Sequence, residues 1–81
     1  MNSQQVAELI ETNLAGAKAT VTSDDNVHYE AVVIAPAFAG QRAVQRHQLV
    51  YATLGPAVGN EIHALALQVF TPEEHVRQNR G

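Results

Sequence analysis

The chain has 81 residues, of which 46% are apolar and 16% charged, a globular composition with room for one small domain. It contains no cysteine, which excludes a disulfide framework, a thiol nucleophile and a zinc site built from thiolates. The formal net charge of −3 has the wrong sign for an extended nucleic-acid surface. No apolar run approaches the roughly 18 residues of a transmembrane helix, and the first residues lack the regions of a signal peptide. We therefore expect a soluble cytoplasmic protein that binds no membrane.

The first half of the chain predicts one helix and two strands. Asn2 or Ser3 can cap a helix that runs to about residue 14, because apolar residues recur there at helical spacing. Polar and apolar residues alternate over Lys18–Thr22, which is typical of a half-buried strand. Residues 23–26 form a turn, and His28–Ile34 is rich in β-branched residues and predicts a central strand.

The second half predicts a helix, a third strand and a last short helix. Pro36 lies in a loop over residues 35–40, and a helix follows over residues 41–54. Its apolar face is expected to contain Val44, His47, Val50, Tyr51 and Leu54.

After that helix, Gly55 and Pro56 end the helical pattern, and a short turn leads to a strand over residues 63–70. Thr71 then caps a last helix, Pro72 takes its first position, and Glu74 completes a capping box with Thr71. Residues 78–81 are predicted to form a frayed tail.

These elements predict a single small α/β (α+β) domain over residues 1–81. Their order is α-β-β-α-α-β-α, with the short turn as the fifth element. Three strands cannot cover their own apolar face, so we expect a mixed three-stranded sheet with helices on one face. The opposite face would stay partly solvated, and a partner could dock there.

Two histidines are the strongest candidates for a functional site. A strand–helix–strand crossover makes its two strands parallel, so His28 and His63 are expected at the same end of the sheet. Their imidazoles could ligate a metal ion or a cluster. Alternatively, each is a structural residue bonded to a backbone carbonyl or to water. Two ligands do not complete a tetrahedral site, so the others would come from Asp24 or Asp25, from solvent or from another molecule.

The remaining candidates have a simpler structural interpretation beside the functional one. Arg42 and Arg46 share a helix face and could contact phosphate or an acidic partner, or form a solvated edge. His47 is expected to be packed and His75 to lie on the surface. The carboxylate pairs at residues 24–25 and 73–74 fit turns and helix starts and are assigned no chemistry. No catalytic motif is present, so the protein is predicted not to be an enzyme.

Three segments together resemble the BolA-like family. Residues 36–54, P-A-F-A-G-Q-R-A-V-Q-R-H-Q-L-V-Y-A-T-L, are similar to its pattern F-x-G, spacer, R-H-x-x-V-Y. Residues 62–74, I-H-A-L-A-L-Q-V-F-T-P-E-E, are similar to its second block, H-A-L, a strand and T-P-x-E. V-H-Y at residues 27–29 resembles its S-H-F element, and the short turn before it is more similar to the compact, IbaG-like branch. The resemblance covers residues 18–74.

The resemblance implies a type II KH-like fold and an adaptor in iron–sulfur cluster trafficking or iron sensing. Its partner would be a monothiol glutaredoxin of the C-G-F-S type, and the two proteins would share a [2Fe–2S] cluster. Glutaredoxin cysteine and glutathione would supply thiolates, and His63, at the start of the last strand, would supply an imidazole. Family members usually carry a second ligand, His or Cys, in the loop before residue 28; residues 23–26 contain neither, so His28 is the nearest substitute. The isolated chain is expected to hold no cofactor and to be a monomer or a weak homodimer.

Two further functions stay open. The family also includes transcriptional regulators linked to stress and cell shape, which implies DNA binding as an alternative. Residues 40–43, G-Q-R-A, do not form the G-x-x-G loop of a nucleic-acid-binding KH module, so Arg42 and Arg46 would have to face phosphate. The third possibility is a zinc- or copper-responsive histidine site that needs no glutaredoxin.

The chain also departs from the family pattern at His75, where the family often shows tryptophan.

Overall fold

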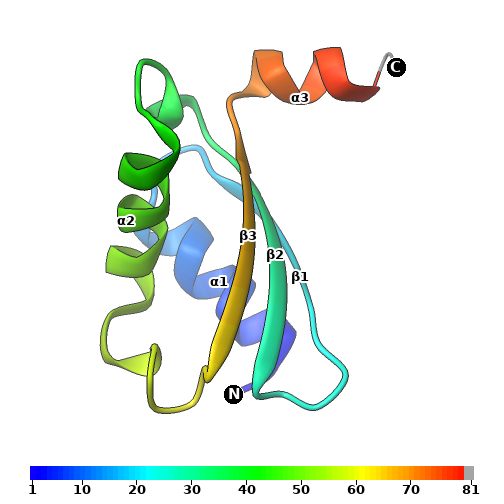
Figure 1. The fold of residues 1–81 in the computed structure, drawn as a ribbon, viewed down its shortest axis with the longest axis vertical. Helices are drawn as coiled ribbons and strands as arrows, with labels where there is room; N and C mark the ends of the chain where they lie inside the picture. The colour runs from blue at the N-terminus through cyan, green and yellow to red at the C-terminus, as the bar shows by residue number, and fades with distance from the viewer. Residues whose placement is uncertain (80–81) are drawn as a thin grey trace.

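A computed structural model describes residues 1–79 of the chain (Figure 1). Over these residues the chain forms α1 (Ser3–Asn13), β1 (Lys18–Thr22), β2 (His28–Ile34), the 3₁₀ turn η1 (Pro36–Phe38), α2 (Ala43–Leu54), the 3₁₀ turn η2 (Gly55–Ala57), β3 (Ala64–Phe70) and α3 (Pro72–Asn79). The predicted order of elements is confirmed, with η2 as the short turn after the second helix. None of the helices in the described part of the chain is long and apolar enough to cross a membrane.

The sheet is mixed, as predicted, and its strands lie in the order β1-β2-β3. The short turn at residues 23–26 makes β1 and β2 an antiparallel hairpin. The crossover through α2 makes β2 and β3 parallel. In this register His28 lies opposite Ala64, and Ile34 lies opposite Phe70. The first residues of β2 and β3 therefore share one end of the sheet.

Helices α1 and α2 cover one face of the sheet (Figure 1). Alternate residues of β2 point toward them, because side chains alternate between the two faces of a strand. The core between these layers contains Val6, Ile10, Leu14, Tyr29, Ala31, Val33, Ala35, Phe38, Val50, Leu54, Ala57 and Ile62. Helix α3 departs from this arrangement, since it extends past the end of β3 (Figure 1).

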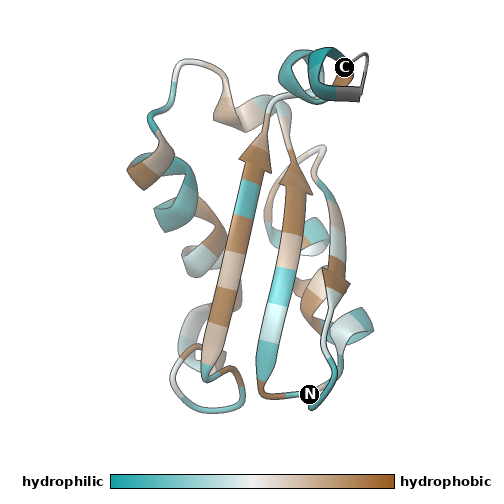
Figure 2. Ribbon diagram, turned by 45° about the vertical axis from the view of Figure 1, so that its right-hand side comes forward, coloured by the Kyte–Doolittle hydropathy of each residue, from teal (hydrophilic) through white to brown (hydrophobic). Residues whose placement is uncertain are grey.

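The other face of the sheet carries no helix. Its exposed residues include His28, Glu30, Ala64, Ala66 and Gln68. Bands of different hydropathy alternate along most of the ribbon of β3 (Figure 2), as expected for a strand with one face against the core and one against solvent. The predicted open face is confirmed.

The predicted apolar face of α2 was partly wrong. Val44 is 67% exposed and Tyr51 38% exposed, whereas Thr53 and Leu54 are buried. The apolar residues of this helix form two overlapping stripes, one through Val44 and Tyr51 and one through Val50 and Leu54. The helix buries the stripe that contains Val50 and Leu54. Sequence periodicity alone could not separate the two stripes.

The boundaries also shift at the ends of several elements. Helix α2 begins at Ala43 and not at residue 41, and β3 begins at Ala64, one residue after His63. The predicted loop over residues 35–40 contains η1. Helix α3 includes residues 78 and 79, where the frayed tail was predicted to begin. The last two positions of that predicted tail, 80 and 81, lie outside the described residues.

Candidate functional site

The two candidate histidines lie at the same end of the sheet, on neighbouring strands. His28 is the first residue of β2, and His63 immediately precedes β3. The backbone N–H of His63 donates to the carbonyl of Val27 at 2.9 Å, which fixes the two chain segments side by side. Both histidines are exposed.

The histidines are not partners in the register, however. The residue opposite His28 is Ala64, and His63 lies one position earlier, in a bend. Among residues 1–79 no group of three or more His, Cys, Asp or Glu side chains is arranged to hold a metal ion. Any metal or cluster bound here would need further ligands from outside these residues.

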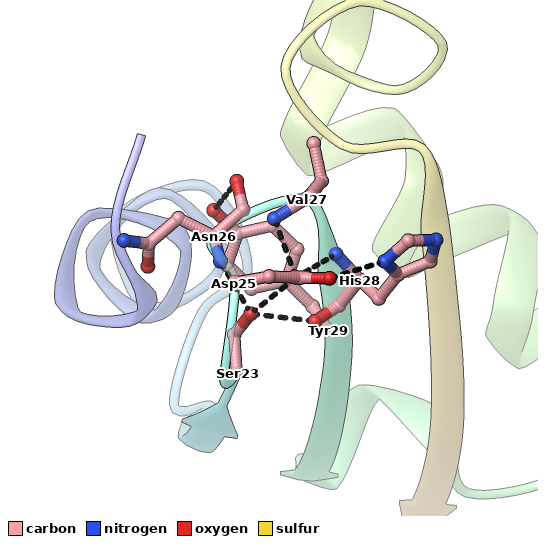
Figure 3. Close-up of polar contacts among 6 residues, drawn as sticks. All are labelled: Ser23, Asp25, Asn26, Val27, His28 and Tyr29. Atoms are coloured by element: carbon pink, nitrogen blue, oxygen red, sulfur yellow. Dashed lines mark hydrogen bonds and ion pairs between the residues drawn. The ribbon is translucent and has the colours of Figure 1, made fainter.

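The turn before His28 is built around Asp25 (Figure 3). Its Oδ1 accepts the backbone N–H groups of Val27 at 3.0 Å and His28 at 2.9 Å. Its Oδ2 lies 2.6 Å from Nδ1 of the His28 ring. This is an Asx turn, in which a short carboxylate side chain takes the place of a backbone acceptor. Asn26 follows with φ of 60°, a left-handed conformation that asparagine tolerates.

Two more contacts hold the turn in place. Ser23 Oγ donates to the carbonyl of His28 at 2.6 Å and accepts the N–H of Asn26 at 2.9 Å. The hydroxyl of Tyr29 donates to the carbonyls of Met1 and, at 2.8 Å, of Asn26, while its ring lies in the core at 2% exposure. The conformation of the turn before His28 is thus fixed by hydrogen bonds from Ser23, which precedes it, and from Tyr29, which follows it.

Hydrogen bonds also set the charge of Asp25. The backbone N–H of His28, then the His28 side chain and then the N–H of Val27 hold the pKa of this carboxyl well below its usual range. Asp25 therefore remains an acceptor at neutral pH. An ionised carboxylate accepts only, so a neutral His28 ring must donate from Nδ1.

An open hollow of about 450 Å³ lies beside this turn on the helix-free face. Its lining residues come from the turn and from the first positions of β2 and β3: Thr22, Ser23, Asp24, Asp25, His28, Tyr29, Glu30, Ala64 and Ala66. His28 belongs to this lining and His63 does not. The two histidines therefore face different surroundings.

The structure separates the two predicted phosphate-facing arginines. Arg46 is only 13% exposed, and its Nη1 and Nη2 lie 2.6 and 3.1 Å from the two carboxylate oxygens of Glu74. Its Nε donates to the carbonyl of Gln41, and its guanidinium lies 5.8 Å from the centre of the Phe38 ring. Arg42 is exposed at the start of α2.

The other two histidines are half-buried. His47 lies on α2, in agreement with the expectation of a packed residue. His75 is not simply a surface residue, because its ring centre lies 6.3 Å from that of Phe70.

The structure places two carboxylates in close side-chain contacts that were not predicted from the sequence. Asp25 has a local signal, since an Asp three positions before a histidine in a turn can reach the ring. Glu74 was predicted as a capping residue, and this is confirmed: the backbone N–H of Thr71 donates to Glu74 Oε1, and the backbone N–H of Glu74 donates to Thr71 Oγ1. Its contact with Arg46 spans 28 positions and has no local signal.

Comparison with known proteins identifies the family of this chain. A family model described as "BolA-like protein" matches residues 5–74. The chain belongs to the BolA-like family. A solved structure of a bolA protein homologue from Coxiella burnetii superposes with a TM-score of 0.87 at 40% identity and covers 95% of this chain and 99% of that one. The BolA domain of SufE1 from Arabidopsis thaliana superposes with a TM-score of 0.72 at 26% identity, covering 89% and 93%.

Curated BolA-like relatives carry two kinds of name. BolA-like protein 1 from Homo sapiens is 38% identical over 72 residues, which are 89% of this chain and 50% of the relative. The "DNA-binding transcriptional regulator BolA" from Haemophilus influenzae is 46% identical over 52 residues, which are 64% of this chain and 50% of the relative. The chain thus spans about half the length of the curated relatives it matches.

Proposed function

We propose that this BolA-like chain is a cytoplasmic adaptor, not an enzyme, that pairs with a monothiol glutaredoxin of the C-G-F-S type. In the pair it would contribute histidine to a shared [2Fe–2S] cluster, in iron–sulfur trafficking or iron and stress regulation. The observation that carries the proposal is the exposed His63 beside the exposed His28, at the shared start of two parallel strands. Family membership over residues 5–74 supports it, because the motifs of this family imply that partner.

The donor set fits such a shared cluster. A [2Fe–2S] cluster takes four protein or thiol ligands, and histidines can replace two of the cysteines. This chain has no cysteine, and residues 1–79 bring no three metal-ligating side chains together. It therefore fits the role of a donor of one or two imidazoles, with thiolates supplied by the partner.

Each histidine would contribute through a fixed backbone and an exposed ring. The bond from the His63 N–H to Val27 fixes the position of its Cα, and the exposed ring can then adapt to a partner surface. His28 is the candidate second ligand. Nitrogen in place of thiolate raises the reduction potential of such a cluster, so the adaptor would alter both its stability and its potential.

The decisive experiment mixes the chain with a monothiol glutaredoxin, iron, sulfide and glutathione and records visible absorption and circular dichroism. A new charge-transfer spectrum that needs both proteins and is lost in His63→Ala supports the proposal. His47→Asn, which removes a histidine from α2, is the matched control and should keep the spectrum. A spectrum identical to that of glutaredoxin alone rejects the proposal, and metal binding by this chain alone would favour the zinc or copper site instead.

The alternative function, DNA binding, has support from the name of the Haemophilus influenzae relative, which is 46% identical over 52 residues. Arg46 is held by Glu74, so exposed Arg42 is the better candidate for a phosphate contact. This alternative predicts an affinity that falls steeply with salt, is weakened by Arg42→Ala and survives His63→Ala. The adaptor function predicts the reverse dependence on these two residues.

A further inference from the structure

The Asp25–His28 contact carries an inference that deepens the proposed function and rests on it for the identity of the ligand. We propose that Asp25 is a positioning residue, which holds the His28 ring with its proton on Nδ1 and so presents Nε2 as the ligand atom of the second histidine.

Asp25 is fixed on both of its oxygens. Its Oδ1 accepts the N–H groups of Val27 and His28 at 3.0 and 2.9 Å, so the carboxylate plane cannot turn away without breaking the Asx turn. Its Oδ2 then meets Nδ1 of His28 at 2.6 Å. Because a carboxylate only accepts, the proton of the neutral ring is on Nδ1 and the lone pair is on Nε2. A carboxylate that orients the far nitrogen of a histidine in this way is a recurring support for metal-ligating histidines.

The ring nitrogen of His28 that does not contact Asp25 belongs to a side chain that lines an open hollow. In Figure 3 the second ring nitrogen points away from Asp25. His28 lines the 450 Å³ hollow on the open face together with Ala64 and Ala66 of β3. These are small side chains, and a partner that covers the open face could bring its own ligands to this position.

The contact has little structural purpose besides orientation. The backbone N–H groups of the turn are already satisfied by Oδ1 of Asp25, without Oδ2. The side chains of His28 and Asp25, which meet at Oδ2, are 67% and 48% exposed. Exposed pairs of this kind contribute little to stability. What the contact does determine is the direction and the tautomer of the His28 ring.

The two histidines therefore have different degrees of freedom. His63 makes no side-chain hydrogen bond within the described part of the chain, so only its backbone is fixed. His28 has both its backbone and its ring fixed. We infer that His28 presents a fixed nitrogen, whereas His63 can adapt its ring to the partner.

The first arm of the test is a long-range proton–nitrogen NMR experiment on the chain alone, at about pH 8, where an ordinary imidazole is neutral. In wild type, His28 should be protonated mainly on Nδ1. Asp25→Asn keeps the Oδ1 acceptor of the turn but puts an amide donor in front of Nδ1, so the His28 proton should move to Nε2. Asp24→Asn removes the same charge one position earlier and should leave the tautomer unchanged. A wild-type His28 protonated on Nε2, or a tautomer that Asp25→Asn does not change, overturns the inference.

The second arm uses the same variants with the glutaredoxin, iron, sulfide and glutathione. Loss of a carboxylate behind a metal-ligating histidine commonly lowers affinity about 10–100-fold, and we expect Asp25→Asn to release the cluster correspondingly more readily. The effect should disappear in a His28→Ala background, because the carboxylate acts only through that ring. Equal cluster binding by wild type and Asp25→Asn, with loss in His63→Ala, overturns the role of His28 and leaves the proposed function standing. Absence of any shared cluster in wild type overturns the proposed function, and with it the ligand role of Nε2, while the NMR arm still decides whether Asp25 orients the ring.

Discussion

Two close contacts of carboxylates lie at opposite ends of the sheet, and their surroundings differ. At the start of β2, Asp25 and His28 are three residues apart and lie 2.6 Å from each other with side chains 48% and 67% exposed. Near the end of β3, Arg46 and Glu74 also approach to 2.6 Å, but they come from α2 and α3 and are 13% and 41% exposed. The first contact belongs to one turn, and the second joins two helices.

On the proposed function, the first contact serves ligand binding and the second serves the stability of the fold. Arg46 also donates to the carbonyls of Gln41 and Val69 and lies over the ring of Phe38. Charge-assisted bonds in such a half-buried network are stronger than those of an exposed pair. Substitutions at the Arg46 end should therefore change the stability of the fold, whereas those at the His28 end should change what the protein binds.

The largest effect on stability is expected from Phe38, which is fully buried beneath Arg46. Phe38→Ala leaves a cavity in the core and should lower the free energy of unfolding by about 3–5 kcal/mol. Denaturant unfolding followed by circular dichroism measures it. Tyr51→Ala truncates a 38% exposed aromatic residue of α2 and should have a clearly smaller effect. Equal losses for the two variants would contradict a core centred on Phe38.

The next effect concerns Arg46 itself. Arg46→Ala removes the bidentate contact with Glu74 and two bonds to backbone carbonyls, and should lower the free energy of unfolding by about 1–3 kcal/mol. Arg42→Ala, on the exposed start of the same helix, should stay within about 0.5 kcal/mol of wild type. The same unfolding experiment compares them. If both variants were neutral, the Arg46 end would be no more important for stability than the surface.

The stabilisation by the Arg46–Glu74 contact should depend on pH. The Arg46 guanidinium first, and the backbone N–H of Thr71 second, lower the pKa of Glu74 from 4.5 to about 2. A lowered folded-state pKa means that the unfolded state takes up protons first as the pH falls, so this stabilisation is full above about 4.5 and is lost toward 2. Glu74→Gln should therefore be less stable than wild type near neutral pH, and the difference should shrink through that window. Urea midpoints across this range measure it, with Glu73→Gln as control; a constant difference at all pH values would contradict the assignment.

Sequence reasoning succeeded where the determining contacts were local. The β-branched residues of His28–Ile34 predicted the central strand, and the crossover predicted that His28 and His63 share one end of the sheet. The capping box at the start of α3 was also readable, because Thr71 and Glu74 are three positions apart. The strand and the capping box depend on neighbours in the chain, so residue types and spacing are sufficient. The shared end of the two strands is a long-range feature, but it follows from the general rule for strand–helix–strand crossovers.

The errors came from contacts between distant segments. Arg46 was expected on a solvated or phosphate-facing edge. Its contact with Glu74 was missed because the two residues are 28 positions apart and no local sequence pattern predicts the contact. Val44 and Tyr51 were predicted on the buried face of α2, because residue spacing alone does not show which side of the helix packs against α1 and β3. The Asp25–His28 contact was within reach of the sequence, because the two residues are only three positions apart in a predicted turn.

The smallest effect on stability, and the largest on function, is expected from the histidines. His63→Ala and His28→Ala remove exposed rings whose backbone bonds stay intact, so each should change the free energy of unfolding by no more than about 0.5 kcal/mol. The unfolding experiment is run on the same samples as the cluster spectra, so that loss of a cluster is not mistaken for loss of the fold. A drop of about 2 kcal/mol or more in His63→Ala would make that histidine a structural residue, because breaking a buried packing or hydrogen-bonding contact has effects of that size. The division of the sheet into a stabilising end and a binding end would then be wrong at the residue on which the adaptor function depends.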